Sequence, residues 1–182
     1  MHITMLGTSG TVPTKERNQA GVFLEYKSEG ILIDCGEGMQ RQFKVGGIPL
    51  TKITRILLTH WHGDHTLGLP GVIQTLGTMD YSGTLHIYGP PKSKFHIARL
   101  FEAFVFDHRI NLEVHEVEGG IIYDEEDFYI EALPLQHKVP CLGFSVIEKE
   151  RHRINMAALK KLGIPEGPHL KTLQDGKDLT YK

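Results

Sequence analysis

Residues 53–65 read ITRILLTHWHGDH, an apolar run followed at once by three histidines and an aspartate. The first seven residues are rich in β-branched and aliphatic side chains, so they predict a buried strand. In open α/β sheets, functional side chains gather just beyond the carboxyl ends of strands, where loops can turn them inward. The stretch therefore predicts a layered α/β fold with a functional site directly after this strand.

The residue types in this stretch indicate a metal site. His60 and His62 lie two positions apart in an extended loop and can share one ion. Asp64 and His65 are adjacent after the turn that Gly63 permits, and they can face a second ion. Imidazole and carboxylate donors suit zinc, with manganese or iron as substitutes. A cation would also relieve the repulsion and desolvation that such a cluster suffers without one. The competing interpretation is an exposed, polar loop that happens to be rich in histidine.

The rest of the chain alternates short apolar runs with amphipathic stretches, a mix that predicts helices covering sheets. The strands we expect are His2–Leu6, Gly21–Tyr26, Ile31–Asp34, Ile53–Thr59, Thr84–Tyr88, Leu112–Val117, Phe128–Leu133 and Gly143–Glu148. The expected helices are Met39–Val45, Leu69–Leu76, Ser93–Phe104 and Ile154–Leu162. In the third helix we expect an apolar face that packs into the core, formed by Phe95, Ala98, Leu100, Phe101 and Phe104.

Two residues outside positions 53–65 are further candidates for the metal site. His137 follows the apolar run from Ile130 to Leu135 and so repeats the pattern of a strand end followed by a histidine. Asp34 ends another strand; it either orients a ligating imidazole through a hydrogen bond or is a simple turn aspartate. The other histidines have no shared geometry in the sequence and are expected to be ordinary surface or core residues: His2, His86, His96, His108, His115, His152 and His169.

Composition sets wider limits. The 182 residues suit one domain, and 40% hydrophobic with 23% charged residues is ordinary for a globular protein. Apolar runs stop far short of a membrane span, and no cleavable leader opens the sequence, so we expect no membrane and a cytoplasmic location. Cys35 and Cys141 are too few and too far apart for a disulfide framework, and buried reduced thiols are expected.

The character of the sequence changes near Glu148. We expect a domain over residues 1–147 and a projecting arm over residues 148–182. The arm carries eight Lys or Arg against five Asp or Glu, a net +3, whereas the rest carries twelve against seventeen, a net −5; together they give the overall −2. The arm is therefore the part better suited to meet a polyanion. A frayed surface hairpin is the alternative.

Several motifs together resemble the ribonuclease Z family of the metallo-β-lactamase superfamily. They are the H-x-H-x-D-H cluster of residues 60–65, the P-x-K-x-R-N loop of residues 13–18, the D-C-G-E-G-x-Q-R-Q stretch of residues 34–42 and the K-K-L-G-I-P-E-G-P segment of residues 160–168. They follow the order of the family and span nearly the whole chain. Apart from the histidine cluster, each motif alone is weak.

The resemblance implies an αβ/βα sandwich and an endonuclease that removes the 3′ trailer of precursor tRNA. A metal-activated hydroxide would attack the phosphodiester and leave a 3′-hydroxyl on the tRNA. The implied cofactor is zinc, two ions per complete subunit: His60, His62 and His137 would bind the first, Asp64 and His65 the second. Asp64 would also accept a proton. Such enzymes are homodimers, with the arm of one subunit holding RNA that is cut in the other.

The same resemblance marks candidate RNA contacts. Lys15 and Arg17 lie on a loop rich in Gly and Pro and could bind phosphates, although most surface Lys and Arg residues do nothing of the kind. Arm lysines would add salt-sensitive phosphate contacts that read the shape of the RNA. The full set of expected RNA-binding residues is Lys15, Arg17, Asn18, Lys160, Lys161, Gly167, Pro168 and Lys171.

One departure from the family pattern matters. Family members continue past the arm to a bridging aspartate in a Gly-Asp-Thr context and a final histidine, and this sequence stops at Lys182. We therefore expect a truncated sandwich with an incomplete second metal site and reduced activity. Two other functions stay open: a different hydrolase on the same scaffold, such as a phosphodiesterase, arylsulfatase-like enzyme or thioesterase, and a non-catalytic binding module stabilised by one metal.

Overall fold

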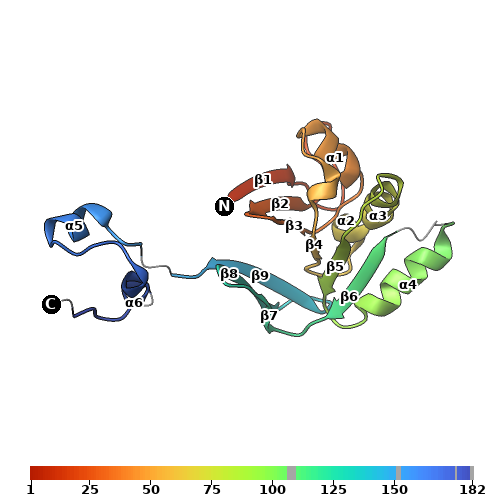
Figure 1. Cartoon of the computed structure of the whole chain (residues 1–182). Helices are drawn as coiled ribbons and strands as arrows, with labels where there is room; N and C mark the ends of the chain where they lie inside the picture. The colour runs from red at the N-terminus through yellow and green to blue at the C-terminus, as the bar shows by residue number, and fades with distance from the viewer. Residues whose placement is uncertain (106–109, 151–152, 175, 181–182) are drawn as a thin grey trace.

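The computed structural model describes residues 1–105, 110–150, 153–174 and 176–180. A six-stranded sheet forms the first part of the fold (Figure 1). Its strands follow one another in chain order across the sheet, β1-β2-β3-β4-β5-β6. Their bounds are β1 His2–Gly7, β2 Gly21–Tyr26, β3 Glu29–Ile33, β4 Arg55–Leu57, β5 Thr84–Gly89 and β6 Asn111–Glu116. The first three strands pair antiparallel, and β3 to β6 pair parallel. The parallel half therefore presents the carboxyl ends of four strands at one edge.

Helices cover one face of this sheet. They are α1 Met39–Val45, α2 Gly63–Thr66, α3 Leu69–Thr78 and α4 Ser93–Ala103, with a short 3-10 turn, η1, at Leu50–Lys52. Because side chains alternate across a strand, Leu85 and Ile87 of β5 point to this face and are fully buried. They join a core that includes Phe43 of α1 and Leu76 of α3. That core fixes the loops that connect strands to helices.

The opposite face of the large sheet packs against a second, three-stranded sheet. It consists of β7 Gly120–Asp124, β8 Phe128–Leu135 and β9 Cys141–Glu148, all antiparallel. Leu57 and Tyr88 from the first sheet meet Phe128 and Ile130 from the second in a separate apolar cluster. The result is a layered arrangement of helices, sheet and sheet.

After β9 the chain leaves both sheets. Helix α5 (Met156–Lys161), the 3-10 turn η2 (Pro168–Leu170) and α6 (Lys171–Gln174) lie apart from the rest at the far end of β8 and β9 (Figure 1). The Asn155 side chain caps α5 by accepting a hydrogen bond from the Ala158 amide at 3.1 Å. Leu159 and Leu170 are buried within this segment and give it a small apolar centre.

Most expected elements are present, and the differences have physical causes. Strand β7 and helices α2 and α6 were not expected, because β7 is a short run that begins at the second glycine of the Gly119-Gly120 pair and each of the two helices spans only four residues. The expected apolar face of α4 is wrong at three of its five positions: Phe95 and Phe104 are more than half exposed, and Ala98 is exposed. Leu100 and Phe101 do pack against the core, as expected, and the buried residues of the helix are Ser93 and Ile97.

The structure also bears on the cysteines and on membrane-spanning helices. Both cysteines are free, as expected, but only Cys35 is buried, whereas Cys141 at the start of β9 is partly exposed. Among the helices of the described residues, none has the length and apolar character needed to cross a membrane.

Candidate metal centre

Three chain segments meet at the carboxyl edge of the parallel strands. The amide of Asp34, just after β3, donates to the Leu57 carbonyl of β4 at 2.9 Å. The amide of Leu142 in β9 donates to the Thr59 carbonyl at 2.8 Å, which draws the β8–β9 turn to the same edge. The loop after β4, the end of β3 and the turn that carries His137 are therefore held side by side.

The sequence-predicted ligands gather here. We call His60, His62, Asp64, His65 and His137 the loop cluster. One ligand nitrogen from each of His60, His62 and His137 lies within 4.8 Å of the other two. Nε2 of His137 is 3.4 Å from Nδ1 of His62, and the ring centroids of His60 and His65 are 4.2 Å apart. Residues 75 positions apart thus converge on one point.

A buried carboxylate holds two members of the loop cluster in place. Asp34 Oδ2 lies 2.7 Å from Nδ1 of His65. Its Oδ1 accepts hydrogen bonds from the Thr59 amide at 2.8 Å and the Thr59 hydroxyl at 3.0 Å. The Thr59 hydroxyl is also 2.9 Å from Nδ1 of His60. With their Nδ1 atoms engaged, His60 and His65 keep Nε2 for another partner, which is how outer groups orient ligating imidazoles.

Asp34 thus makes the contact required by the first of its two sequence interpretations. It adopts the left-handed region at φ 58°, an uncommon conformation for a residue other than glycine. Thr59 was not singled out from the sequence. A threonine that ends a strand carries no signal of this kind, and its part emerges only from the fold.

The carboxylate of Asp64 faces the same space. Its Oδ2 is 3.5 Å from Nε2 of His65 and 3.5 Å from the Thr11 hydroxyl. Thr11 belongs to the loop after β1, and the Gln19 side-chain amide donates to the Thr11 carbonyl at 2.8 Å to fix that loop. Asp64 and His65 therefore form a second pair of donors next to the three histidines.

The pKa values of two histidines in the loop cluster shift in opposite directions. Burial, together with the neighbouring His65 charge, lowers the pKa of His60 to about 4, so its ring is neutral near pH 7. The hydrogen bond that His65 donates to the Asp34 carboxylate raises the pKa of His65. A neutral, buried imidazole beside two others is the donor set that divalent zinc prefers. The residues present fit a zinc-type ion.

Two glycines let the backbones of this edge approach closely. A Cβ added to Gly68 would lie 2.1 Å from the Gly36 carbonyl oxygen, and one added to Gly36 would lie 2.7 Å from the Asp64 carbonyl oxygen. The Cys35 amide donates to the His65 carbonyl at 2.7 Å, and the Gly68 amide donates to the Cys35 carbonyl at 2.9 Å. The loop after β3 is thus packed backbone to backbone against α2.

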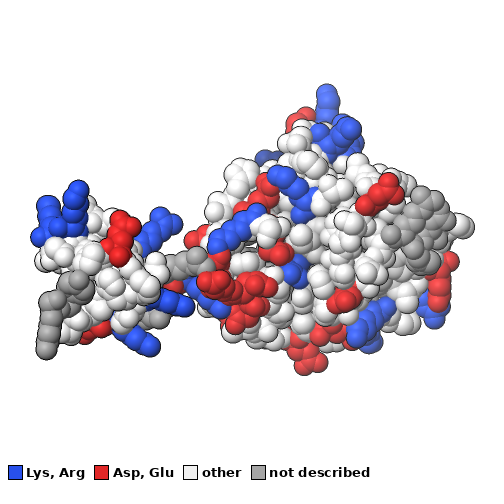
Figure 2. Space-filling model, in the orientation of Figure 1, with Lys and Arg blue, Asp and Glu red and all other residues white. Residues whose placement is uncertain are grey.

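The expected RNA contacts fall on two separated surfaces. Lys15 and Arg17 are exposed at the tip of the loop after β1. The Asn18 amide instead donates to the Glu37 carbonyl at 2.8 Å, so this side chain ties two loops together. Lys160, Lys161, Pro168 and Lys171 are exposed on the C-terminal segment, and Gly167 is partly exposed. Figure 2 shows basic side chains on this segment and acidic ones on the nearby body.

Two of the remaining histidines share a geometry that the sequence did not indicate. His86 of β5 and His115 of β6 lie close together and share Glu113 as a neighbour. We call His86, Glu113 and His115 the strand cluster. Residues 27 positions apart meet here through parallel pairing, which no spacing in the sequence reveals. His108 and His152 fall outside the described residues.

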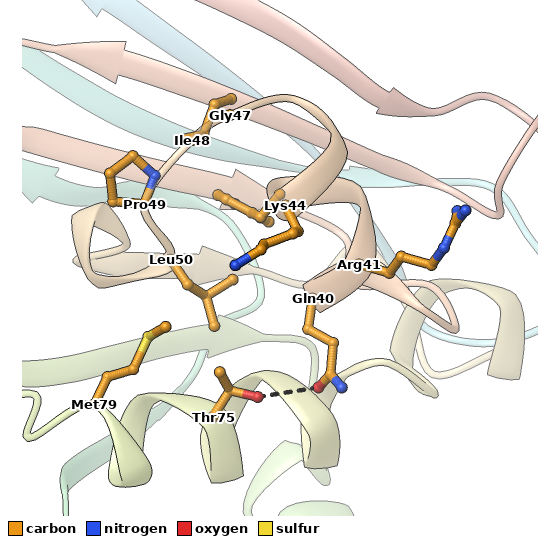
Figure 3. A pocket seen from close by; sticks show the side chains of 10 residues that line it. Gln40, Arg41, Lys44, Gly47, Ile48, Pro49, Leu50, Thr75 and Met79 are labelled. Carbon is orange, nitrogen blue, oxygen red and sulfur yellow. Dashed lines mark hydrogen bonds between the residues drawn. The ribbon is translucent and has the colours of Figure 1, made fainter.

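A hollow of about 640 Å³ lies between α1 and α3. Lys44, Leu50, Thr75 and Met79 are among the residues that line it, and Gln40 accepts a hydrogen bond from the Thr75 hydroxyl at 3.2 Å (Figure 3). None of its lining residues belongs to the loop cluster. The hollow is therefore separate from the candidate metal centre.

Comparisons with known proteins agree with this architecture. The family model described as Anti-Pycsar protein Apyc1 matches residues 1–130. Ribonuclease Z of Picosynechococcus sp. is 42% identical over 99% of this chain. The chain spans about 58% of the length of the curated relatives it matches.

Solved structures give the same result. Human tRNase Z, short form, superposes with a TM-score of 0.76 and 32% identity, covering 82% of this chain and 66% of that one. The metallo-beta-lactamase fold protein YhfI from Bacillus subtilis, 22% identical, superposes with a TM-score of 0.62, covering 79% and 56%. The predicted metallo-β-lactamase fold is confirmed.

Proposed function

Because this chain belongs to the Anti-Pycsar protein Apyc1 family, has the metallo-β-lactamase fold and is a homologue of ribonuclease Z, we propose that it cleaves RNA phosphodiesters. The substrate we propose is precursor tRNA, cut at the junction with its 3′ trailer. The observation that carries the proposal is the convergence of His60, His62 and His137 beside Asp64 and His65.

The residues of the loop cluster would divide the work. His60, His62 and His137 would hold one divalent ion, and Asp64 with His65 would supply donors to a second. When bound, zinc would make a water molecule more acidic and polarise the phosphate. The Asp64 carboxylate, whose Oδ2 lies 3.5 Å from both the Thr11 hydroxyl and Nε2 of His65, would accept a proton from the attacking group. Asp34 and Thr59 would keep the histidine rings in position.

The C-terminal segment is the proposed RNA grip. Its exposed Lys160, Lys161 and Lys171 would contact phosphates, and the adjoining Gly167 and Pro168 would set the shape of the tip. Lys15 and Arg17 lie on the loop that also carries Thr11, so they would bind phosphate near the metal centre. Two copies of the protein would form the active dimer, which light scattering of the purified protein would measure.

Single-turnover assays test the proposal. Zinc-loaded chain in excess over a precursor tRNA with a 3′ trailer should produce one cut at the trailer junction. Slow cleavage is expected, because Asp64 and His65 alone offer few donors to a second ion. Asp64→Asn should lower the rate about 100-fold or more. Absence of any cut with zinc, manganese or iron would refute the proposed function.

The grip has its own matched test. Lys160→Ala combined with Lys161→Ala should weaken tRNA binding and reduce the slope of log affinity against log salt by about 2. Lys44→Ala, on helix α1 of the body, should change neither quantity. Equal effects of the arm and body variants would remove the arm from the proposal.

A different phosphodiesterase function is the second candidate, because the family model that matches residues 1–130 is described as Anti-Pycsar protein Apyc1 and not as ribonuclease Z. A small phosphodiester such as bis(p-nitrophenyl) phosphate separates the two. Rapid cleavage of this compound with no cleavage of precursor tRNA would favour the second candidate.

A further inference from the structure

The strand cluster arises from the register of the parallel strands β5 and β6. His86 pairs with Glu113, and Tyr88 pairs with His115, so the four residues point to one face of the sheet. This face is opposite to the one that buries Leu85 and Ile87 under the helices. The side chains of the strand cluster therefore lie on the face of the large sheet that is turned toward the second sheet, and none of them belongs to the loop cluster.

The distances within the strand cluster match the edges of a metal coordination polyhedron. Nδ1 of His86 is 3.2 Å from Nε2 of His115 and 3.4 Å from Oε2 of Glu113. Nε2 of His115 is 3.7 Å from the same Glu113 oxygen. Zinc bonds of about 2.0–2.1 Å in tetrahedral geometry give ligand-to-ligand separations of about 3.3–3.4 Å. These three ligand atoms form a triangle. One proton can make a hydrogen bond between only two of them at a time, whereas one metal ion can bind all three.

The surroundings keep the donors oriented and reachable. The Tyr88 ring stacks on His115 with centroids 4.5 Å apart and planes 19° apart. Side-chain exposure is 26% for His86, 36% for His115 and 58% for Glu113, so an ion can enter from solvent. Burial and the neighbouring His86 also lower the pKa of His115, which favours a neutral ring.

Two cationic side chains near the strand cluster, Arg55 and Lys94, would lower its affinity for a metal ion without preventing binding. Arg55 of β4 lies in register with His86. Its Nε is 3.2 Å from Oε2 of Glu29, and its guanidinium lies 3.5 Å from the Tyr123 ring centroid. Lys94 also lies near enough to oppose a positive charge on His115. Because Arg55 is paired with a carboxylate, much of its field is compensated.

We infer that His86, Glu113 and His115 form a second divalent metal site of zinc type, separate from the loop cluster. Two imidazoles and one carboxylate supply three ligands, and water would complete the tetrahedron. The ion would join β5 to β6 through side chains, in addition to their backbone hydrogen bonds. It needs no residue of the proposed catalytic centre.

Zinc binding by the full chain tests this inference. In a His60→Ala and His62→Ala background, which disables the loop cluster, dialysis against micromolar zinc should leave about one ion per chain. Adding Glu113→Gln and His115→Gln should remove that ion. Cobalt in place of zinc should give strong visible absorption of the tetrahedral type, and the same two substitutions should abolish it.

The control is His2→Gln. His2 also pairs with a carboxylate, Glu25 at 3.6 Å, but within the part of the chain that the structure describes the two belong to no group of three possible ligands. This variant should keep the ion. Glu113→Gln alone covers the case in which the double variant folds poorly, because this exposed side chain can change without disturbing the core; zinc affinity should fall at least about tenfold. Equal zinc content in the Glu113 variant and its parent, or equal loss in the His2 variant, would overturn the inference.

Discussion

The two histidine clusters are built in different ways. The loop cluster sits on turns at the ends of β4 and β8, and a network from Asp34 and Thr59 holds its rings. The strand cluster sits inside regular strands, and the pairing of β5 with β6 sets its distances. One depends on buried hydrogen bonds of a loop and the other on sheet register.

Because of this difference, different substitutions should perturb the two clusters. Loops can bring many donors together, but each side chain then needs its own support. In the strand cluster the backbone register sets the spacing of the donors, and among the described residues it brings three of them together. Substitutions in the Asp34 network should therefore weaken the loop cluster and leave zinc at the strand cluster unchanged.

The largest effect is expected for Asp34→Ala. It leaves the Thr59 amide, the Thr59 hydroxyl and His65 without their shared acceptor in a buried position. The free energy of unfolding should fall by about 3 kcal/mol, measured by urea denaturation. Zinc affinity at the loop cluster should fall about 10–100-fold. Asp80→Ala is the matched control, since Asp80 also has a positive φ but is exposed. A similar loss in both variants would argue against the network.

Gly68→Ala should be next. The new methyl group would meet the Gly36 carbonyl oxygen at 2.1 Å, so α2 must move. A loss of about 1–3 kcal/mol is expected, together with weaker zinc binding at the loop cluster only. Gly10→Ala provides the comparison, because nothing lies within 4 Å of an added Cβ there. Unchanged stability of the Gly68 variant would contradict this packing.

Thr59→Val isolates a single hydroxyl of the network. It keeps the shape of the side chain but removes the hydrogen bonds to Asp34 and His60. The expected loss is about 1–2 kcal/mol with a smaller decrease in zinc affinity than for Asp34→Ala. Thr78→Val, whose exposed hydroxyl bonds only to the Thr75 carbonyl, should cost less. Calorimetry would rank the loss of stability in Asp34→Ala, Gly68→Ala, Thr59→Val and Thr78→Val.

The smallest effect involves the cysteines and leaves stability unchanged. Cys35 is fully buried and burial raises the pKa of its thiol, so it should resist thiol reagents in the native protein. Cys141 is partly exposed beside the turn that carries His137 and should react first, although burial raises its pKa too. Zinc at the loop cluster should slow its labelling. Mass spectrometry after brief labelling would identify the residue, and faster labelling of Cys35 would contradict the burial.

The sequence predicted the loop cluster because its donors are close along the chain and follow a recognisable strand. His137 was found by the same logic, a histidine just past a strand. Thr59 and Thr11 were missed, since a hydroxyl near a strand end has many ordinary roles. The strand cluster was missed for a different reason: parallel register joins His86 to Glu113 over 27 positions, and register depends on the whole sheet.

The bond between the Leu142 amide and the Thr59 carbonyl has a consequence for the molecule as a whole. His62 follows Thr59 by three positions and His137 precedes Leu142 by five, so this hydrogen bond lies close to a pair of histidines that are 75 positions apart in the chain. An ion bound by both histidines would cross-link the two ends of a long chain segment. Cross-links that close long segments give the largest gain in the free energy of unfolding. Removal of the ion by a chelator should then loosen the contact between the loop after β4 and the turn between β8 and β9.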